Sequence, residues 1–199
     1  YLFVGNPGTG KTEVARVMGE MLGSLGLVSK GRTIEAPASS LIGNQHGGGK
    51  ATLDALNKAQ GGVLFIDEAH QLAESPQGRE VLNTLVPEME NRRRDLTVIL
   101  AGYSEKMQLL LEQEPGLQSR TETIRFEDYK AQDLLEIAKI MLAERGRTLS
   151  GDASNLLLRV LAFHYNNRDA GFGNARLVRE LIDKQILDAQ AMRLSYFPN

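Results

Sequence analysis

The stretch "GNPGTGKT", residues 5–12, decides how the rest of the sequence is interpreted. It follows an apolar run, "YLFVG", and precedes a segment whose apolar residues step by three and four, so the expected order is strand, glycine loop, helix. The glycines allow backbone N–H groups to turn inward around a phosphate, and the helix directs its positive end at the same anion. The stretch therefore predicts a phosphate-binding loop. Its predicted contact residues are Gly5, Asn6, Pro7, Gly8, Thr9, Gly10, Lys11, Thr12 and Glu13.

A second stretch, "VLFIDEAHQ" at residues 63–71, ends an apolar run with two adjacent carboxylates. Asp67 and Glu68 would repel each other and lose hydration at the end of a buried strand unless a cation lies between protein and phosphate. We expect Asp67 and the hydroxyl of Thr12 to hold Mg²⁺, and Lys11 to reach the β- and γ-phosphates. Glu68 points elsewhere and is expected to polarise the attacking water. Together the two motifs predict hydrolysis of a nucleoside triphosphate.

The fold class follows from the alternation of apolar runs with segments of helical spacing. The runs lie at residues 1–5, 32–36, 62–67, 96–102 and 122–127. Alternating strands and helices imply right-handed crossovers and a parallel sheet. Beyond residue 128 only helical patterns occur, at about 131–145, 152–165 and 174–193. We therefore predict an α/β P-loop NTPase domain at residues 1–128 and a small helical domain at residues 129–199.

Composition narrows the possible partners and environment. Acids number 25 and bases 23, so the net charge is −2, and "NRRRD" at 91–95 is the only dense basic run. Nucleic acid is therefore not an expected partner, although a local patch would be compatible with it. The absence of cysteine excludes disulfides and thiolate metal sites. No apolar run approaches the ~20 residues that cross a bilayer, and no signal peptide is visible.

From these features we expect no membrane association, and a location in the cytoplasm or an organelle interior rather than secretion. The chain opens on an apparent strand without an initiator Met. We therefore expect it to be part of a longer protein whose N-terminal portion is missing. The letters "DEAH" also suggest a helicase, but that class needs a second domain carrying arginines, which this sequence does not supply. His70 is expected to begin a helix rather than to act in catalysis.

Several stretches together resemble the AAA+ ATPases, in particular the branch of the red-type Rubisco activases (CbbX/CfxQ) and the stage V sporulation protein K group. They are "GNPGTGKT", "GGVLFIDEAHQL", "VILAGYSEKM", "PGLQSR", "RFEDY" and "GFGNARLVRELID", spanning residues 5 to about 183. The resemblance implies ATP as the nucleotide, a five-stranded parallel sheet with a helical lid, and self-association into a ring, usually a hexamer.

The resemblance also assigns roles to individual side chains. Arg120 matches the arginine finger that acts in trans on a neighbouring subunit's γ-phosphate; the alternative is a surface arginine at a helix end. Arg176 matches the lid arginine that touches phosphate from the same chain; the alternative is an interdomain salt bridge, and Arg179 is a second candidate. Tyr103 stands where many AAA+ proteins carry a sensor asparagine.

One stretch departs from the pattern of the related remodellers. In those proteins the loop corresponding to "SSLIGNQHGGGK", residues 39–50, lines a central pore with an aromatic residue. Here the matching positions are Gln45, His46 and Gly47, and the three consecutive glycines are expected to make the loop flexible. Either the loop grips substrate weakly through polar groups, or the protein does not thread polypeptide.

The leading functional hypothesis is an ATP-driven remodeller of an unidentified partner protein. Two alternatives remain open: a nucleotide-gated scaffold, which the missing pore aromatic favours, and a nucleic-acid motor, which only "NRRRD" supports.

Overall fold

The computed structural model describes residues 1–45 and 47–187, which form two compact units. The first unit consists of residues 1–5 and 10–126, and the second consists of residues 6–9 together with the chain from Glu127 onward. The short segment 6–9, inside the predicted phosphate loop, therefore groups with the C-terminal part of the chain.

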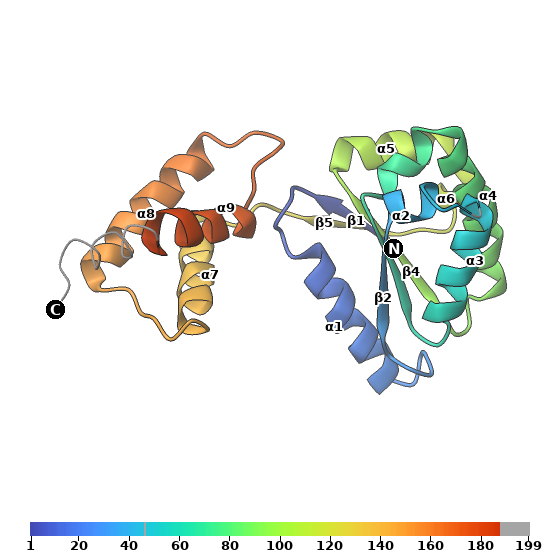
Figure 1. Cartoon of the computed structure of the whole chain (residues 1–199), viewed down its shortest axis with the longest axis horizontal. Helices are drawn as coiled ribbons and strands as arrows, with labels where there is room; N and C mark the ends of the chain where they lie inside the picture. Colours follow the sequence, from blue (N-terminus) through green and yellow to red (C-terminus); the bar gives the residue numbers. More distant parts are fainter. Residues whose placement is uncertain (46, 188–199) are drawn as a thin grey trace. The chain divides into compact units, whose positions relative to one another are not determined.

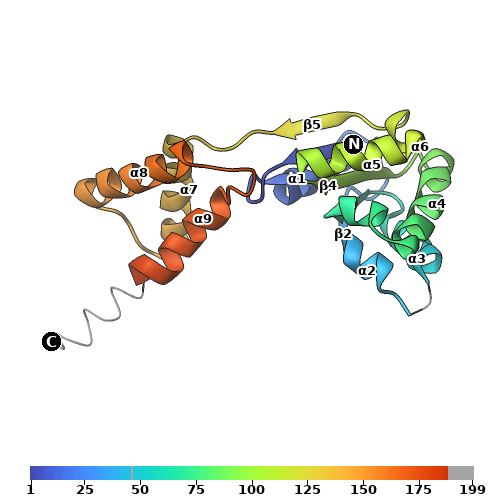
Figure 2. The ribbon, with the colours of Figure 1, turned by 90° about the horizontal axis from the view of Figure 1, so that it is seen from above.

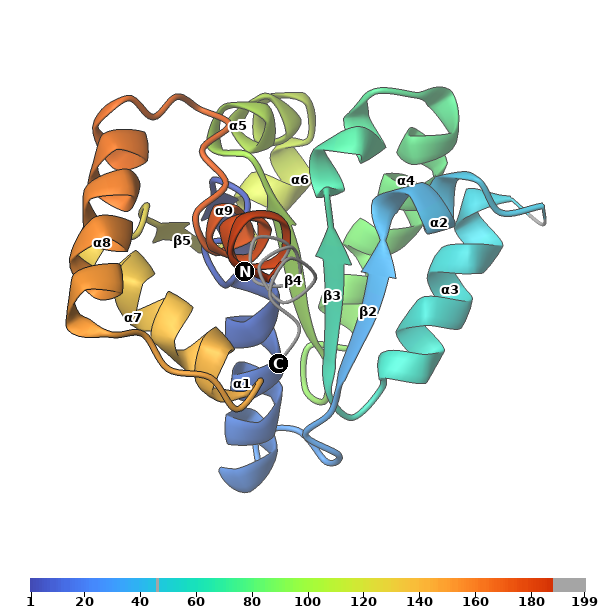
Figure 3. The same ribbon diagram turned by 60° about the vertical axis from the view of Figure 1, so that its left-hand side comes forward.

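The first unit is built on a five-stranded parallel sheet with the strand order β2-β3-β4-β1-β5 (Figures 1 and 3). Its strands are β1 (Leu2–Gly5), β2 (Thr33–Pro37), β3 (Val63–Asp67), β4 (Thr97–Gly102) and β5 (Thr123–Phe126). β1 is an inner strand paired on both edges, because Leu2 is in register with Leu100 of β4 and with Thr123 of β5. The predicted parallel α/β sheet is confirmed.

Helices cover both faces of this sheet, because alternate side chains of each strand point to opposite sides. On one face Phe3, Phe65 and Ile99 pack against the first helix, α1 (Lys11–Ser24). On the other face Leu64 and Leu100 belong to a larger core that includes residues from all the remaining helices. These remaining helices are α2 (Ala38–Ile42), α3 (Gly48–Ala59), η1 (Ala69–Ala73), α4 (Pro76–Asn91), α5 (Ser104–Gln113) and α6 (Pro115–Gln118).

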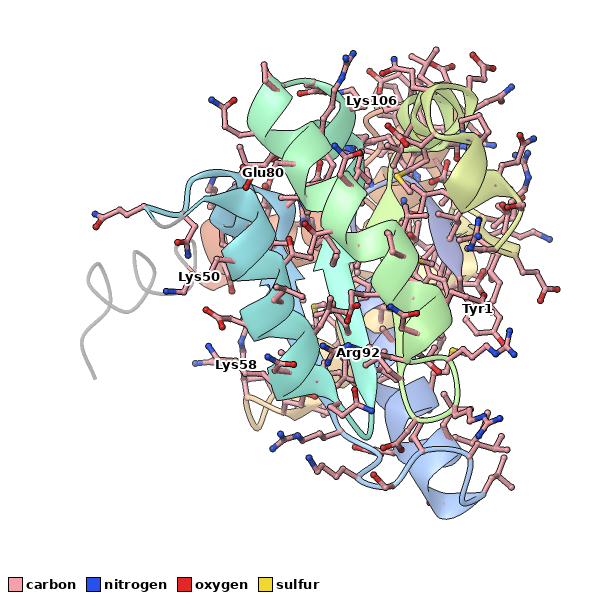
Figure 4. All side chains as sticks on the ribbon, turned by 90° about the vertical axis from the view of Figure 1, so that its right-hand side faces the viewer. Tyr1, Lys50, Lys58, Glu80, Arg92 and Lys106 are labelled. Atoms are coloured by element: carbon pink, nitrogen blue, oxygen red, sulfur yellow. The ribbon has the colours of Figure 1, made fainter. Side chains whose placement is uncertain are left out.

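The glycine run after residue 46 begins α3 rather than forming a loop. A Cβ on Gly48 would lie 2.8 Å from Val81 Cγ2 and 2.9 Å from the carbonyl oxygen of Gln77, so α3 packs closely on α4. The backbone N–H groups of Gly48 and Gly49 donate to the carboxylate of Glu80 on α4, over 3.3 and 3.1 Å (Figure 4). The expectation of a flexible loop is therefore wrong for Gly48 and Gly49, while His46 lies outside the described residues.

The second unit is helical, as expected (Figure 2). It contains α7 (Ala131–Ala143), α8 (Gly151–Asn166) and α9 (Ala175–Glu180), which continues into the π-helical segment η2 (Leu181–Leu187). Leu134, Leu161 and Ile182 are fully buried in its core. The predicted helix at 174–193 is thus present up to residue 187, and its remainder lies outside the described residues.

Across residues 1–45 and 47–187, no helix combines the length and apolar character needed to cross a membrane.

Candidate functional site

The predicted phosphate loop joins the carboxyl end of β1 to the first turn of α1. Gly8 and Gly10 have φ angles of 72° and 88°, in the left-handed region that L-amino acids with a Cβ rarely adopt. Lys11 Nζ donates to the carbonyl oxygen of Gly5 over 2.9 Å, so the ammonium lies back over the loop. Thr12 follows in the first turn of α1 and is partly exposed. The loop thus places its cation and hydroxyl at the positive end of α1.

Glu13 lies on an exposed part of α1, where its carboxylate pairs with Arg16 at 2.9 Å. Arg16 also pairs with Glu35 of β2, at 2.7 Å. This geometry directs Glu13 toward a surface ion pair, and its predicted nucleotide contact stays a prediction.

The two predicted acids lie at the end of β3, on the edge of the sheet where all five parallel strands have their carboxyl ends (Figure 3). Asp67 Oδ1 accepts from the backbone N–H of Glu68 over 2.9 Å, which fixes the orientation of that carboxylate. Because β1 also ends at this edge, Asp67 and the start of α1 lie on the same side of the first unit. This placement is the one that the two motifs require.

Glu68 stands in a strained backbone conformation, with φ 53° and ψ 36°. A non-glycine residue in this left-handed region costs about 1–2 kcal/mol, so the surrounding structure must hold it there. Its side chain is 39% exposed, and Oε2 lies 3.4 Å from Nε2 of His70. Glu68 is therefore reachable by water while its carboxylate tip contacts a neighbouring imidazole.

His70 is almost completely buried, with 4% of its surface exposed. Burial lowers the pKa of its imidazole, although the Glu68 carboxylate opposes that shift. Its ring packs against that of Tyr103 in an edge-to-face arrangement, with ring centroids 5.6 Å apart. The sequence interpretation missed this contact with Glu68, and the only available signal was a histidine three residues after Asp67 on a short helical turn.

Tyr103 comes directly after β4 and immediately precedes α5. Its phenol ring lies beside the imidazole of His70, and Nζ of Lys106 is 5.6 Å from the centroid of the phenol ring. The structure thus brings Tyr103 and Glu68 to the same histidine.

Arg120 is exposed just beyond α6. Its guanidinium donates to the carbonyl oxygen of Gly116 over 3.0 Å and to Ser119 Oγ over 3.2 Å. These contacts hold the side chain at the helix end without burying its charge. The arrangement suits an arginine that acts on another molecule, and it suits a surface arginine equally well.

In the second unit, Asn174 connects the phosphate-loop segment 6–9 to the start of α9. Its side-chain N–H₂ donates to Asp128 Oδ1 over 2.8 Å and to the carbonyl oxygen of Pro7 over 3.3 Å, and its Oδ1 accepts from the backbone N–H of Tyr129 over 2.9 Å. Asn6 donates to the same Asp128 carboxylate over 3.0 Å. In the sequence, the stretch around Asn174 only resembles the lid of AAA+ proteins, and that resemblance does not predict the network around Asn174.

The backbone around Asn174 is equally specific. Its φ of 47° and ψ of −121° match the first central position of a type II′ turn, which glycine usually occupies. The turn is closed by the hydrogen bond from the Arg176 N–H to the Gly173 carbonyl, 2.8 Å. Arg176 and Arg179 are both exposed on α9, one turn apart. The same turn therefore orients the predicted lid arginine and ties it to the loop segment.

The basic run at 91–95 is locally neutralised. Arg92 pairs with Glu88 at 2.6 Å, and Arg93 pairs with Glu90. Asp95 accepts from the backbone N–H of Ser29. These contacts give the run little net positive character.

A glycine loop between β1 and α1, with an Asp-Glu pair at the end of β3, defines the class of P-loop NTPases. The model of the ATPase family associated with various cellular activities (AAA) matches residues 1–128, and an AAA lid domain model matches residues 130–196. The chain therefore belongs to the AAA family of ATPases.

Individual relatives agree with this assignment. Stage V sporulation protein K of Bacillus subtilis (strain 168) is 44% identical over 97% of this chain and 62% of its own length. Protein CfxQ of Xanthobacter flavus is 41% identical over 96% of this chain and 62% of its own. The chloroplastic ribulose bisphosphate carboxylase/oxygenase activase of Cyanidioschyzon merolae is 40% identical, over 98% and 68%. The resemblance to this branch is confirmed, and the chain spans about three fifths of the length of the first two relatives.

Proposed function

We propose that this chain couples the binding and hydrolysis of Mg-ATP, at subunit boundaries within a ring, to the remodelling of a partner protein. The observation that carries the proposal is the position of Glu68, which follows Asp67 at the same sheet edge as the phosphate loop and stays reachable by water. The names of the relatives, which include a Rubisco activase, favour a protein substrate. The ring, the partner and a cytoplasmic or organellar location are parts of the proposal.

The side chains present fit a magnesium nucleotide. Thr12 and Asp67 offer hydroxyl and carboxylate oxygens, the donors that Mg²⁺ prefers. Within residues 1–45 and 47–187 no three His, Cys, Asp or Glu side chains cluster as a metal site. Two protein oxygens fit a cation that is held largely by phosphate and water, as Mg²⁺ usually is with nucleotides. When bound, the metal would neutralise charge that develops on the phosphate oxygens.

We assign the predicted side chains the following roles. Lys11 and the backbone N–H groups of the glycine loop bind and orient the phosphates, with Asn6 and Thr9 shaping the loop. Glu68 orients the attacking water and accepts its proton. Arg120 of a neighbouring subunit and Arg176 of the same subunit supply positive charge to the transition state. Tyr103, whose ring packs beside His70, is proposed to sense the state of the γ-phosphate.

The test compares Glu68→Gln with Lys11→Ala in the full-length protein. We expect Glu68→Gln to keep its thermal stabilisation by Mg-ATP and to lose hydrolysis about 10²–10⁴-fold, the usual contribution of a general base. Lys11→Ala should lose the thermal stabilisation itself. Phosphate release and melting temperature are measured for both. Glu74→Gln, an exposed acid just after η1, is the matched control and should hydrolyse ATP normally.

Normal turnover by Glu68→Gln would reject its role as base, and undiminished nucleotide binding by Lys11→Ala would reject the phosphate assignment.

A nucleotide-gated scaffold is the second candidate, because the segment expected to line a pore differs from a gripping loop. It has no aromatic residue, and its glycines are held in α3 by Glu80. Partners retained by the full-length Glu68→Gln protein with ATP can be identified by mass spectrometry. Stimulation of wild-type ATPase activity by such a partner supports remodelling, whereas unchanged basal turnover supports the scaffold.

A nucleic-acid motor remains the least favoured candidate, since the basic run is paired with acids. A steep salt dependence of DNA or RNA binding would revive it.

A further inference from the structure

His70 is a buried polar side chain that neither motif explains. Its residue is 4% exposed, and Nδ1 has no hydrogen-bond partner among the described residues. The other nitrogen, Nε2, lies 3.4 Å from Oε2 of Glu68. A leucine would fill a similar space without an unpaired polar atom, so packing alone gives no reason for an imidazole here.

The ring of His70 is fixed from more than one side. The edge-on contact with Tyr103 restrains it on one side, and a Cβ added to Gly102 would come within 3.0 Å of Nδ1. The glycine at the end of β4 therefore lets the backbone approach the imidazole closely. A ring held in this way presents Nε2 to Glu68 in one orientation.

The protonation pattern follows from burial and from the available acceptor. Burial favours the neutral imidazole, which carries a single N–H. Since a Glu68 carboxylate oxygen lies 3.4 Å from Nε2, we assign that hydrogen to Nε2. The 3.4 Å separation is long for a hydrogen bond, as is common for catalytic contacts before substrate is bound.

We propose that His70 is a positioning residue for Glu68, which it holds by donating Nε2–H to the carboxylate. The left-handed backbone at φ 53° fixes the direction in which the Glu68 side chain leaves the chain. The imidazole fixes the tip of that side chain, so that one carboxylate oxygen is engaged and the other is available to water. The proposal rests on the proposed function, because it assumes that Glu68 acts as the base.

The first experiment measures ATP hydrolysis by the full-length protein with His70 changed to Leu, Met or Gln. Leu and Met fill the space without a donor, whereas Gln keeps an N–H donor at similar reach. We expect kcat to fall about tenfold in the two apolar variants, with KM for ATP within about twofold of wild type. His70→Gln should stay within about threefold of wild-type kcat. His164→Leu, the same replacement on α8 of the second unit, should leave both constants unchanged.

The second experiment asks whether His70 acts through Glu68. In the Glu68→Gln background, His70→Leu should lower the residual hydrolysis less than twofold, because the group that it positions is already gone. A further tenfold loss there would overturn the proposal, as would equal losses for His70→Gln and His70→Leu. Failure of both apolar variants to fold would also overturn it, since His70 would then serve stability.

The experiments distinguish failure of the proposed function from failure of the His70 proposal alone. Normal hydrolysis by Glu68→Gln rejects the proposed base, and with it the role of His70. A large loss in Glu68→Gln together with wild-type kcat in His70→Leu rejects the role of His70 alone.

Discussion

Replacing Asn174 tests whether the contact between the loop segment 6–9 and α9 is as important as its geometry indicates. Asn174 is fully buried, and its side chain hydrogen-bonds to Asp128, to the N–H of Tyr129 and to the carbonyl groups of Pro7 and Phe172. Asn174→Gly removes these bonds while keeping a residue that adopts φ 47° without strain. The Gly variant therefore isolates the contribution of the side chain.

The expected loss of unfolding free energy follows from the groups that lose their hydrogen bond to the Asn174 side chain. A buried donor or acceptor without a partner costs about 1–3 kcal/mol, and the Asp128 carboxylate keeps other partners in Asn6 and Arg168. We therefore expect the Tyr129 N–H and the Pro7 carbonyl to dominate, with a total loss of about 3 kcal/mol for Asn174→Gly. For a chain of this size that corresponds to a fall in melting temperature of roughly 6–12 °C. Asn174→Ala should lose about 1 kcal/mol more, because alanine strains the turn.

The assay is equilibrium unfolding by calorimetry or by urea with circular dichroism. Asn167→Gly is the matched control, because the exposed Asn167 side chain makes one hydrogen bond within the described residues, to the Phe163 carbonyl. The loss of unfolding free energy in Asn167→Gly should stay below about 1 kcal/mol. The reasoning is refuted if Asn174→Gly costs no more than Asn167→Gly, or if Asn174→Ala is no less stable than Asn174→Gly.

Two further predictions concern the first unit. Gly48→Ala should lower the free energy of unfolding in urea by about 1–3 kcal/mol, because the added Cβ would press into α4. Gly151→Ala is the control and should be neutral or slightly stabilising, because the space around its added Cβ is open. Equal effects of the two substitutions would contradict the close packing of α3 on α4. Hydrogen bonds from Ser29 lower the pKa of the Asp95 carboxyl below its ordinary value of 3.8. The ionised Asp95 carboxylate therefore stabilises the folded protein above pH 3.8, and this stabilisation is lost as the pH falls through the lowered pKa. The difference in unfolding free energy between wild type and Asp95→Asn should consequently shrink from pH 6 to pH 3. A difference independent of pH would contradict that shift.

The sheet could be predicted from sequence because its inner strands are buried on both faces. Such strands appear as continuous apolar runs, and the runs at residues 63–66 and 98–101 leave little room for another interpretation. The phosphate loop was equally accessible, since its function depends on glycines at fixed spacing between a strand and a helix. Both signals are local, so a single sequence contains them completely.

The contacts that sequence reasoning missed depend on backbone angles or on distant partners. The approach of His70 to Glu68 requires a left-handed glutamate, which no residue pattern indicates. The partner of Asn174 at Pro7 lies at the opposite end of the chain. Gly48 was misread because a glycine run predicts mobility as readily as it predicts close helix packing, and only the position of α4 distinguishes the two.

The inner position of β1 has a consequence for folding during synthesis. Of the five strands of this sheet β1 comes earliest in the chain, yet both of its neighbours, β4 and β5, follow β2 and β3. β2 and β3 can pair with each other as soon as residue 67 has left the ribosome, whereas the apolar side chains of β1 must wait for the later strands. In nascent chains that end before β4, both hydrogen-bonding edges of β1 are therefore unpaired, and the second edge is covered only when β5 has emerged.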